Sequence, residues 1–217
     1  MTQSPGEDFS RGAICFKISP LSIIPNRRPR GYTGTNHETL GSDIISVLRT
    51  LSLPEQVLGE EEVKRLSDVR PDRWYPVGWL LDLMEKLDER VGYYGLLRMG
   101  RMVFSLSHEK RVLASATCAY DIVNGIDGMY HHANRGTGIG GWRLLRFEPG
   151  YAELEKNTPH HCVMEQGILK AGLAAVGAPS LVSQPTCFRR GDSVCVYTIT
   201  SVIVDERWMG KESSRTS

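Results

Sequence analysis

The feature that most constrains the fold of this chain of 217 residues is a change in hydrophobic pattern along its length. Up to about residue 130, apolar side chains recur at helical spacing, as in the run that begins at Trp79 and stops before Gly92. Beyond Trp142, short β-branched segments flank turn signals such as Glu148-Pro149-Gly150. Helices followed by strand, strand, helix, strand and strand indicate an α+β domain. We therefore expect a helical N-terminal half packed on a four-stranded antiparallel sheet.

The individual elements follow from spacing and from start and stop signals. In the first part we expect helices over residues 44–51, from Pro54 onward, and over 79–91, 93–106 and 112–130. In the last third we expect one hairpin over residues 142–154 and a second over 181–204. Thr158 as N-cap, Pro159 at the first helical position and Gly177 at the end predict a helix between the hairpins.

The chain is predicted to form one domain. We expect an N-terminal extension over residues 1–35 with a short strand over 13–18, a single ligand-binding domain over 36–208, and a disordered tail over 209–217. A domain of this size buries roughly 70% of the surface that its unfolded chain exposes, so it needs neither a metal nor a disulfide to stay folded.

Charge and hydropathy exclude several classes of protein. Lys and Arg number 26 and Asp and Glu 25, and this balance argues against nucleic-acid binding by phosphate neutralisation. The sequence has no run of 18 apolar residues that could span a membrane. The N-terminal residues do not form a secretory signal, so we expect a cytoplasmic protein.

The spacing of the cysteines carries the clearest chemical signal. A three-residue loop over residues 190–192 would place Cys187 directly opposite Cys195, with Cβ atoms about 4.5–5.5 Å apart. That separation suits two thiolates on one metal, and it also suits a disulfide. A shift of the register by one residue would move the two side chains to opposite faces.

Cys162 lies in the first turn of the predicted helix, where the helix dipole favours a thiolate. Three thiolates could form most of a tetrahedral zinc site, with His160, His161 or Gln184 as the fourth ligand and histidine chemically the best of these. The alternative is that the cysteines are small buried residues on the inner face of the sheet.

These residues resemble a known family, the 4-vinyl reductase domain. The matching string is His161-Cys162-x24-Cys187-x3-Gly191-Asp192-x2-Cys195, followed by Val196-Tyr197-Thr198-Ile199. The resemblance covers about residues 96–204. The strings Trp74-Tyr75-Pro76 and Leu97-Arg98-Met99-Gly100-Arg101 also resemble an uncharacterised group of bacterial paralogues. The broader fold that the resemblance implies is shared with haem–nitric oxide binding domains and trafficking-particle subunits.

The resemblance implies a compact, often dimeric, ligand-binding module. In the aromatic-effector sensors of this family, three cysteines and a glutamate hold a zinc ion, and Gln184 stands here where the glutamate would be. A tryptophan about twenty residues before the first cysteine lines the effector pocket of those sensors, and Trp142 falls at this position. The histidine that accompanies that tryptophan has three candidates here, His108, His131 and His132.

We therefore expect a sensor or regulator that binds a largely apolar or aromatic small molecule. The residues expected to line the pocket are Trp142, Tyr130, Tyr94 and His132, because such pockets are apolar with a few polar anchors. Without an output domain in the sequence, the signal would pass by protein contact, through a homodimer or another protein partner.

Two other functions remain open. One is a haem-based gas sensor. Haem–nitric oxide binding domains carry a Tyr-x-Ser-x-Arg motif for the haem propionates, and the nearest string here, Tyr94-x-Leu96-x-Arg98, lacks the serine, so haem is disfavoured and zinc is the possible cofactor. A zinc- or thiol-dependent enzyme could act on a hydrophobic biosynthetic intermediate. The sequence has no Gly-x-Ser-x-Gly, P-loop or recognisable pair of catalytic carboxylates, so we expect a binding domain rather than an enzyme.

Overall fold

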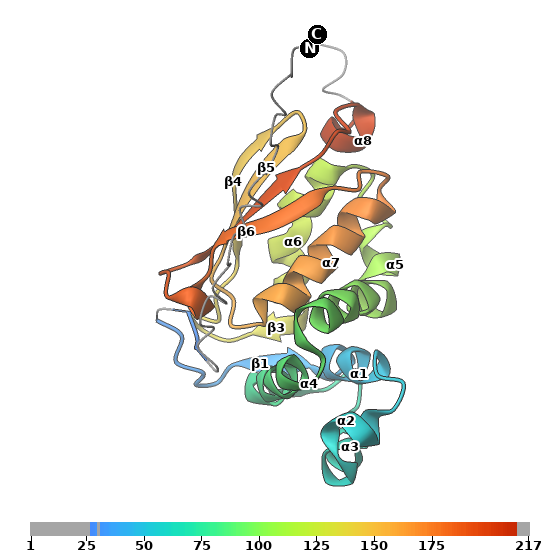
Figure 1. Cartoon of the computed structure of the whole chain (residues 1–217), viewed down its shortest axis with the longest axis vertical. Helices are drawn as coiled ribbons and strands as arrows, with labels where there is room; N and C mark the ends of the chain where they lie inside the picture. Colours follow the sequence, from blue (N-terminus) through green and yellow to red (C-terminus); the bar gives the residue numbers. More distant parts are fainter. Residues whose placement is uncertain (1–26, 30, 212–217) are drawn as a thin grey trace, which may run out of the picture.

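The computed structural model describes residues 27–29 and 31–211 (Figure 1). The strand expected over residues 13–18 and the tail beyond Lys211 lie outside the described residues. Within the described part, no helix is both long enough and apolar enough to cross a membrane.

The first part of the chain is helical, as the sequence predicts. Its elements are α1 (Gly41–Arg49), α2 (Pro54–Leu58), α3 (Glu60–Ser67), α4 (Val77–Val103), the π-helical turn η1 (Phe104–His108) and α5 (Glu109–Val112). Gly92 has a φ of 62° and kinks α4 at the point where the sequence predicts one helix to end and the next to begin. A left-handed φ of this kind favours glycine, so the kink is encoded locally.

A four-stranded antiparallel sheet forms the other part of the domain. Its strands are β4 (Trp142–Glu148), β5 (Tyr151–Lys156), β6 (Leu181–Thr186) and β7 (Cys195–Thr200), in the order β4-β5-β7-β6. Helices α6 (Ala119–Ala133) and α7 (Cys162–Ala175) lie against one face of this sheet (Figure 1). The short elements η2 (Phe188–Arg190) and α8 (Glu206–Met209) complete the C-terminal part. The predicted α+β architecture is confirmed.

A second, smaller sheet was not expected from the sequence. Strands β1 (Glu38–Leu40), β2 (Trp74–Pro76) and β3 (Asn134–Arg135) pair in the order β2-β1-β3. Each has only two or three residues, too few to show a period of two in the sequence. This sheet ties the start of the described domain to the end of α6, where the hydroxyl of Thr39 also donates a hydrogen bond to the Ala133 carbonyl at 3.3 Å.

Two predicted helix starts were wrong. The helix expected over 112–130 is interrupted, and α6 begins only at Ala119, where the Asp121 carboxylate accepts hydrogen bonds from Thr117 and Cys118. Helix α7 begins at Cys162 rather than at Pro159. Thr158 does not cap it, because its hydroxyl donates a 2.8 Å hydrogen bond to the side chain of Glu165 instead.

Helix α7 is held between the sheet and α4, and its contact with α4 depends on two glycines. A Cβ atom on Gly100 would overlap the carbonyl oxygen of Met164, and a Cβ atom on Gly167 would overlap that of Leu97. The two helix backbones therefore approach more closely than any side chain would allow. By contrast, a Cβ atom on Gly125 of α6 would meet open space.

This difference between glycines gives a testable prediction. Gly167→Ala forces α4 and α7 apart and should lower the free energy of unfolding by about 1–3 kcal/mol, the usual cost of overpacking. Gly125→Ala is the matched control and should raise stability by up to about 1 kcal/mol through helix propensity. Urea denaturation followed by circular dichroism measures both. Equal effects of the two substitutions would show that α4 and α7 do not meet at these glycines.

Candidate functional site

One row of side chains on the inner face of the sheet organises the site. Along β5, Ala152, Leu154 and Lys156 are buried and alternate with more exposed residues, as a strand with one covered face requires. Lys156 pairs with Trp142 on one neighbouring strand and with Cys195 on the other. Because side chains alternate between the two faces of β5, Lys156 points to the face that α7 covers, and its side chain has no exposed surface.

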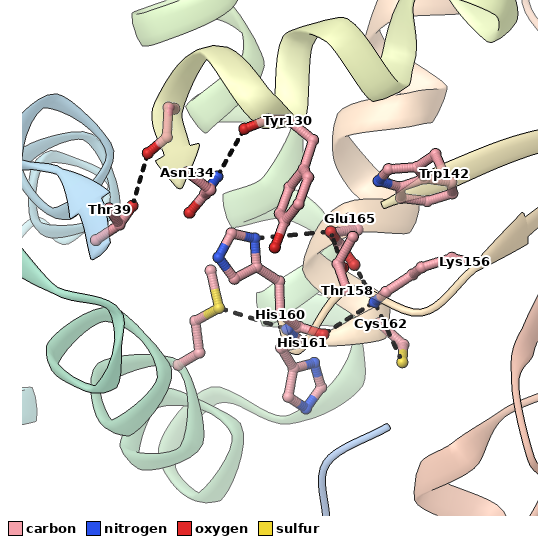
Figure 2. Close-up of polar contacts among 12 residues, drawn as sticks. Thr39, Tyr130, Asn134, Trp142, Lys156, Thr158, His160, His161, Cys162 and Glu165 are labelled. Atoms are coloured by element: carbon pink, nitrogen blue, oxygen red, sulfur yellow. Dashed lines mark hydrogen bonds and ion pairs between the residues drawn. The ribbon is translucent and has the colours of Figure 1, made fainter. Parts of the chain in front are cut away.

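The buried ammonium of Lys156 is surrounded by acceptors (Figure 2). It forms an ion pair with Glu165 of α7, donates a 2.9 Å hydrogen bond to the carbonyl of His160, and lies 3.6 Å from the Sγ atom of Cys162. Burial alone would lower the pKa of Lys156, but the negative charge of Cys162 and Glu165 holds it above its ordinary value. Burial raises the pKa of the Glu165 carboxyl, and Lys156 opposes that shift. The ammonium therefore remains charged in the interior.

Three thiols meet beside this ion pair. The Sγ atom of Cys162 lies 3.5 Å from that of Cys187 and 3.5 Å from that of Cys195, and all three Sγ atoms are within 4.8 Å of one another. Hydrogen bonds from the other two thiols, together with Lys156, lower the pKa of Cys162 well below its ordinary value. The pKa values of Cys187 and Cys195 are raised, because these thiols serve Cys162 as donors. The trio could hold a thiophilic metal ion, or it could carry one shared negative charge beside Lys156.

The three expected candidates for a fourth metal ligand lie differently, and one of them, His160, lines a cavity described below. Gln184 is beside the trio, and its side chain contributes to the lowered pKa of Cys162. The imidazole of His161 is directed elsewhere, and its Nε2 atom lies 3.2 Å from the carboxylate of Asp88 on α4. Asp88 in turn contacts Arg189, which forms a buried ion pair with Glu85. His161 therefore belongs to a charged network between α4 and the β6–β7 hairpin.

A small cavity of about 50 Å³ lies on the other side of Glu165, lined by residues of α1, α4, η1, α6 and α7 and by Asn134, Trp142 and His160. Trp142 and Tyr130, two of the residues expected to line a pocket, both line this cavity. The imidazoles of His108 and His160 line it as well. Among the described residues, the Nδ1 atom of His108 and the Nε2 atom of His160 have no hydrogen-bond partner. The mostly apolar cavity is thus lined by two imidazoles that each have one nitrogen without a hydrogen-bond partner.

The titratable groups of the cavity are largely neutral. Burial lowers the pKa of His108 to about 4 and that of His160 to about 3, so both are uncharged imidazoles at neutral pH. Burial raises the pKa of Asp43, which also lines the cavity, to about 7. The cavity therefore offers hydrogen-bonding and metal-ligating atoms with little net charge.

A second, open groove of about 440 Å³ lies between α5, α6 and α7. His132 and Arg111 line this groove, and neither lines the cavity. Three apolar side chains, Ile126, Met129 and Ile168, line both spaces. We call these three residues the partition, because they are the shared wall between the cavity and the groove.

The expectation for Tyr94 was wrong in its placement. Its side chain is 83% exposed on α4 and lines neither the cavity nor the groove. Helical spacing indicated a helix here, but the kink at Gly92 turns this stretch of α4 so that Leu96 and Met99 are buried instead. The sequence analysis did not single out Lys156, Glu165 or Arg111. Of these, only Lys156 could have been found from the sequence. It follows Ala152 and Leu154 at a spacing of two residues, which places it on the same buried face of the strand.

The buried pair of Lys156 and Glu165 gives a testable prediction. Lys156→Met leaves the Glu165 carboxyl buried without its cation and should lower the free energy of unfolding by about 3–5 kcal/mol. The double variant Lys156→Met with Glu165→Gln removes both charges and keeps a group that can accept from Thr158, so it should regain most of that loss. Chemical denaturation of the unaltered chain, the two single variants and the double variant measures the coupling. Additive losses in the double variant would show that the two side chains do not interact.

Comparison with known proteins places this geometry in a fold. No protein-family model matches the chain, and no curated protein matches it. Among solved structures, an H-NOX protein from S. oneidensis in the Fe(II)NO ligation state is 15% identical, with a TM-score of 0.58, and the match covers 74% of this chain and 98% of that one. An Fe(II) unliganded H-NOX protein from K. algicida is 12% identical, with a TM-score of 0.55, over 75% of this chain and 96% of that one. A further H-NOX structure, from work on haem distortion in that family, has a TM-score of 0.52 at 15% identity and covers 75% of this chain and 92% of that one.

These comparisons correct the expectation about cofactors. The sequence analysis set haem aside in favour of zinc because the string around Tyr94 lacks a serine. The neighbours in fold are proteins described with Fe(II) and haem, and none of the comparisons supports zinc. The absence of one short motif was too weak a reason, since other residues can hold the same group. The 4-vinyl reductase assignment is not shown either. At these identities the likeness establishes the architecture alone, and the chain has the H-NOX fold.

Proposed function

We propose that this chain is a ligand-binding sensory domain whose ligand occupies the space around His108, His160 and Trp142. The observation that carries the proposal is a small, mostly apolar cavity lined by two imidazoles, those of His108 and His160, each with one buried nitrogen that has no hydrogen-bond partner among the described residues. A buried polar atom without a partner is costly, so such atoms in a cavity indicate a site for a ligand. The H-NOX fold supports a sensory role, because the neighbours in fold carry small gas ligands.

The volume of the site depends on the partition. The cavity of about 50 Å³ has room for little more than a water molecule or a diatomic gas. Rotation of Ile126, Met129 and Ile168 would join it to the groove of about 440 Å³. The joined space falls in the range of roughly 300–1,000 Å³ that is usual for ligand and cofactor pockets. The proposed ligand therefore enters from the groove and displaces the partition.

Haem is the ligand that the comparisons favour, and the donor chemistry of the site fits it. His108 or His160 would hold the iron through its unpartnered nitrogen, since a neutral imidazole is a common axial ligand of haem. The apolar residues of the partition and Trp142 would contact the macrocycle and exclude water. Bound haem would supply an iron centre that takes a diatomic gas. The protein's own part is to orient one imidazole and to keep the site dry.

Reconstitution with hemin tests this form of the proposal. Titration of hemin into the full chain should give a shifted Soret band that saturates at about one haem per chain. His108→Ala or His160→Ala should abolish or move the band, which assigns the iron ligand. His131→Ala is the matched control, because this exposed histidine lies on α6 next to Asp127 and should leave the band unchanged. A spectrum of free hemin in every protein would contradict the haem-binding form.

A second candidate is a sensor for an aromatic or other largely apolar molecule without haem. The positions of Trp142 and Tyr130 in the cavity support it, as does His108, which was one of the candidates to accompany the tryptophan. A panel of aromatic compounds and fatty acids should then include members that raise the melting temperature saturably. Trp142→Ala should weaken that shift at least several-fold, whereas Trp79→Phe, on the far side of α4 against Tyr75, should not. No shift with any compound would remove this candidate.

Output by protein contact and a homodimeric state remain predictions from the sequence. We propose that the three cysteines help to position Glu165, which lines the cavity. Lys156 contacts both the thiol of Cys162 and the carboxylate of Glu165.

A further inference from the structure

We infer that the open groove between α5, α6 and α7 is a subsite for a carboxylate, and that Arg111 is its anchor. The inference rests on the proposed function, because it assigns the polar end of the same ligand. The ligand class is an amphipathic acid, with an apolar body that passes the partition and a carboxylate that stays in the groove. A free fatty or aromatic acid and the propionates of a haem share this chemistry.

The Arg111 side chain lines the groove and lacks a partner among the described residues. Arg111 is half-buried, and burial lowers the pKa of its guanidinium. Within the part of the chain that the structure describes, this guanidinium has neither an ion pair nor a hydrogen bond. The other described arginines without such a partner, at positions 49, 73, 90, 98 and 101, are exposed, whereas the buried Arg189 pairs with Glu85. A partly desolvated cation without a counter-ion is unfavourable unless an anion is supplied.

The titratable groups around Arg111 offer it little negative charge. Asp43 acts on Arg111 from α1, but the two are not within ion-pair distance, and burial raises the pKa of that carboxyl to about 7. The imidazoles of His108 and His132 also interact electrostatically with Arg111. Burial is the larger cause of their lowered pKa values, and the positive charge of Arg111 lowers these pKa values further. Neutral imidazoles do not compete for an anion, and His132 can donate a hydrogen bond to it.

Among the described residues that line the groove, Asp121 is the only charged one besides Arg111. The Asp121 carboxylate is already engaged, because it accepts hydrogen bonds from the amide and the hydroxyl of Thr117 and from the amide of Cys118 at the start of α6. These bonds hold its pKa low and keep it at the helix terminus. The groove therefore keeps the positive charge of Arg111 available for a ligand.

The shape of the groove suits a molecule with two unlike ends. Gly125 and Gly128 lie along it on α6, and a Cβ atom on either would meet open space, so the groove has room beside the helix. Phe104 and Leu169 add apolar surface, and the partition separates this surface from the cavity. An apolar body directed at the partition leaves a terminal carboxylate on the Arg111 side.

Matched pairs of probes test the inference. Dodecanoic acid and dodecan-1-ol differ only in the terminal group, and so do hemin and its dimethyl ester. The full chain should bind the acid of at least one pair at least ten-fold more tightly than its neutral partner, measured by quenching of tryptophan fluorescence or by the Soret band. Discrimination in the first pair alone identifies a free acid as the ligand class, and discrimination in the second pair alone identifies haem propionates.

Variants then assign the discrimination to Arg111. In Arg111→Gln the acid and its neutral partner should bind with equal affinity, and Arg111→Lys should restore part of the preference. Lys110→Gln is the matched control, because Lys110 is the adjacent exposed cation on α5 and does not line the groove. Equal binding of both partners to the unaltered chain, or a preference that survives in Arg111→Gln, overturns the subsite and leaves the proposed function standing. No binding of any of the four probes overturns both.

Discussion

The buried ion pair between Lys156 and Glu165 connects the parts of the molecule that matter for function. Lys156 comes from the middle of the sheet, and Glu165 comes from the helix that covers it. One side of the pair contacts the thiol of Cys162, and the other side borders the cavity with His160. Apolar residues could fill the same space with equal or greater stability, so such a pair is poor evidence for stability alone. Its effect here is to fix the rotation of α7, which decides which side chains face the thiols and which face the cavity.

Much of the architecture was accessible from the sequence because long amphipathic runs and strong turns carry local signals. The kink at Gly92, the hairpin around Pro149 and the pairing of β6 with β7 belong to this class. Thr186 pairs with Val196, the register that brings Cys187 and Cys195 together, and the irregularity lies between Ser183 and Thr186, where Pro185 cannot donate to the ladder. The small sheet of β1, β2 and β3 carries no such signal, because its strands are too short and form only through contacts distant in sequence.

The candidate site was accessible only in part. The approach of Cys187 to Cys195 follows from hairpin register, which is local, and Cys162 follows from its place at the start of α7. The cavity depends on how several elements distant in sequence pack together. Trp142 was identified through the resemblance, while His108 and Arg111 are brought to the site by a π-helical turn and a short helix that no periodicity marks. His160 and His161 show the same limit. They are adjacent in sequence, yet one faces the cavity and the other faces Asp88.

The partition formed by Ile126, Met129 and Ile168 has a consequence for the speed of response. It consists of side chains, so it can open by rotamer changes while the helices keep their places. Rotamer changes of exposed side chains take picoseconds to nanoseconds and helix displacements microseconds to milliseconds, and packed side chains fall between these limits. Under the proposed function, the ligand would cross such a barrier and reach the cavity without waiting for the slower rearrangement of helices.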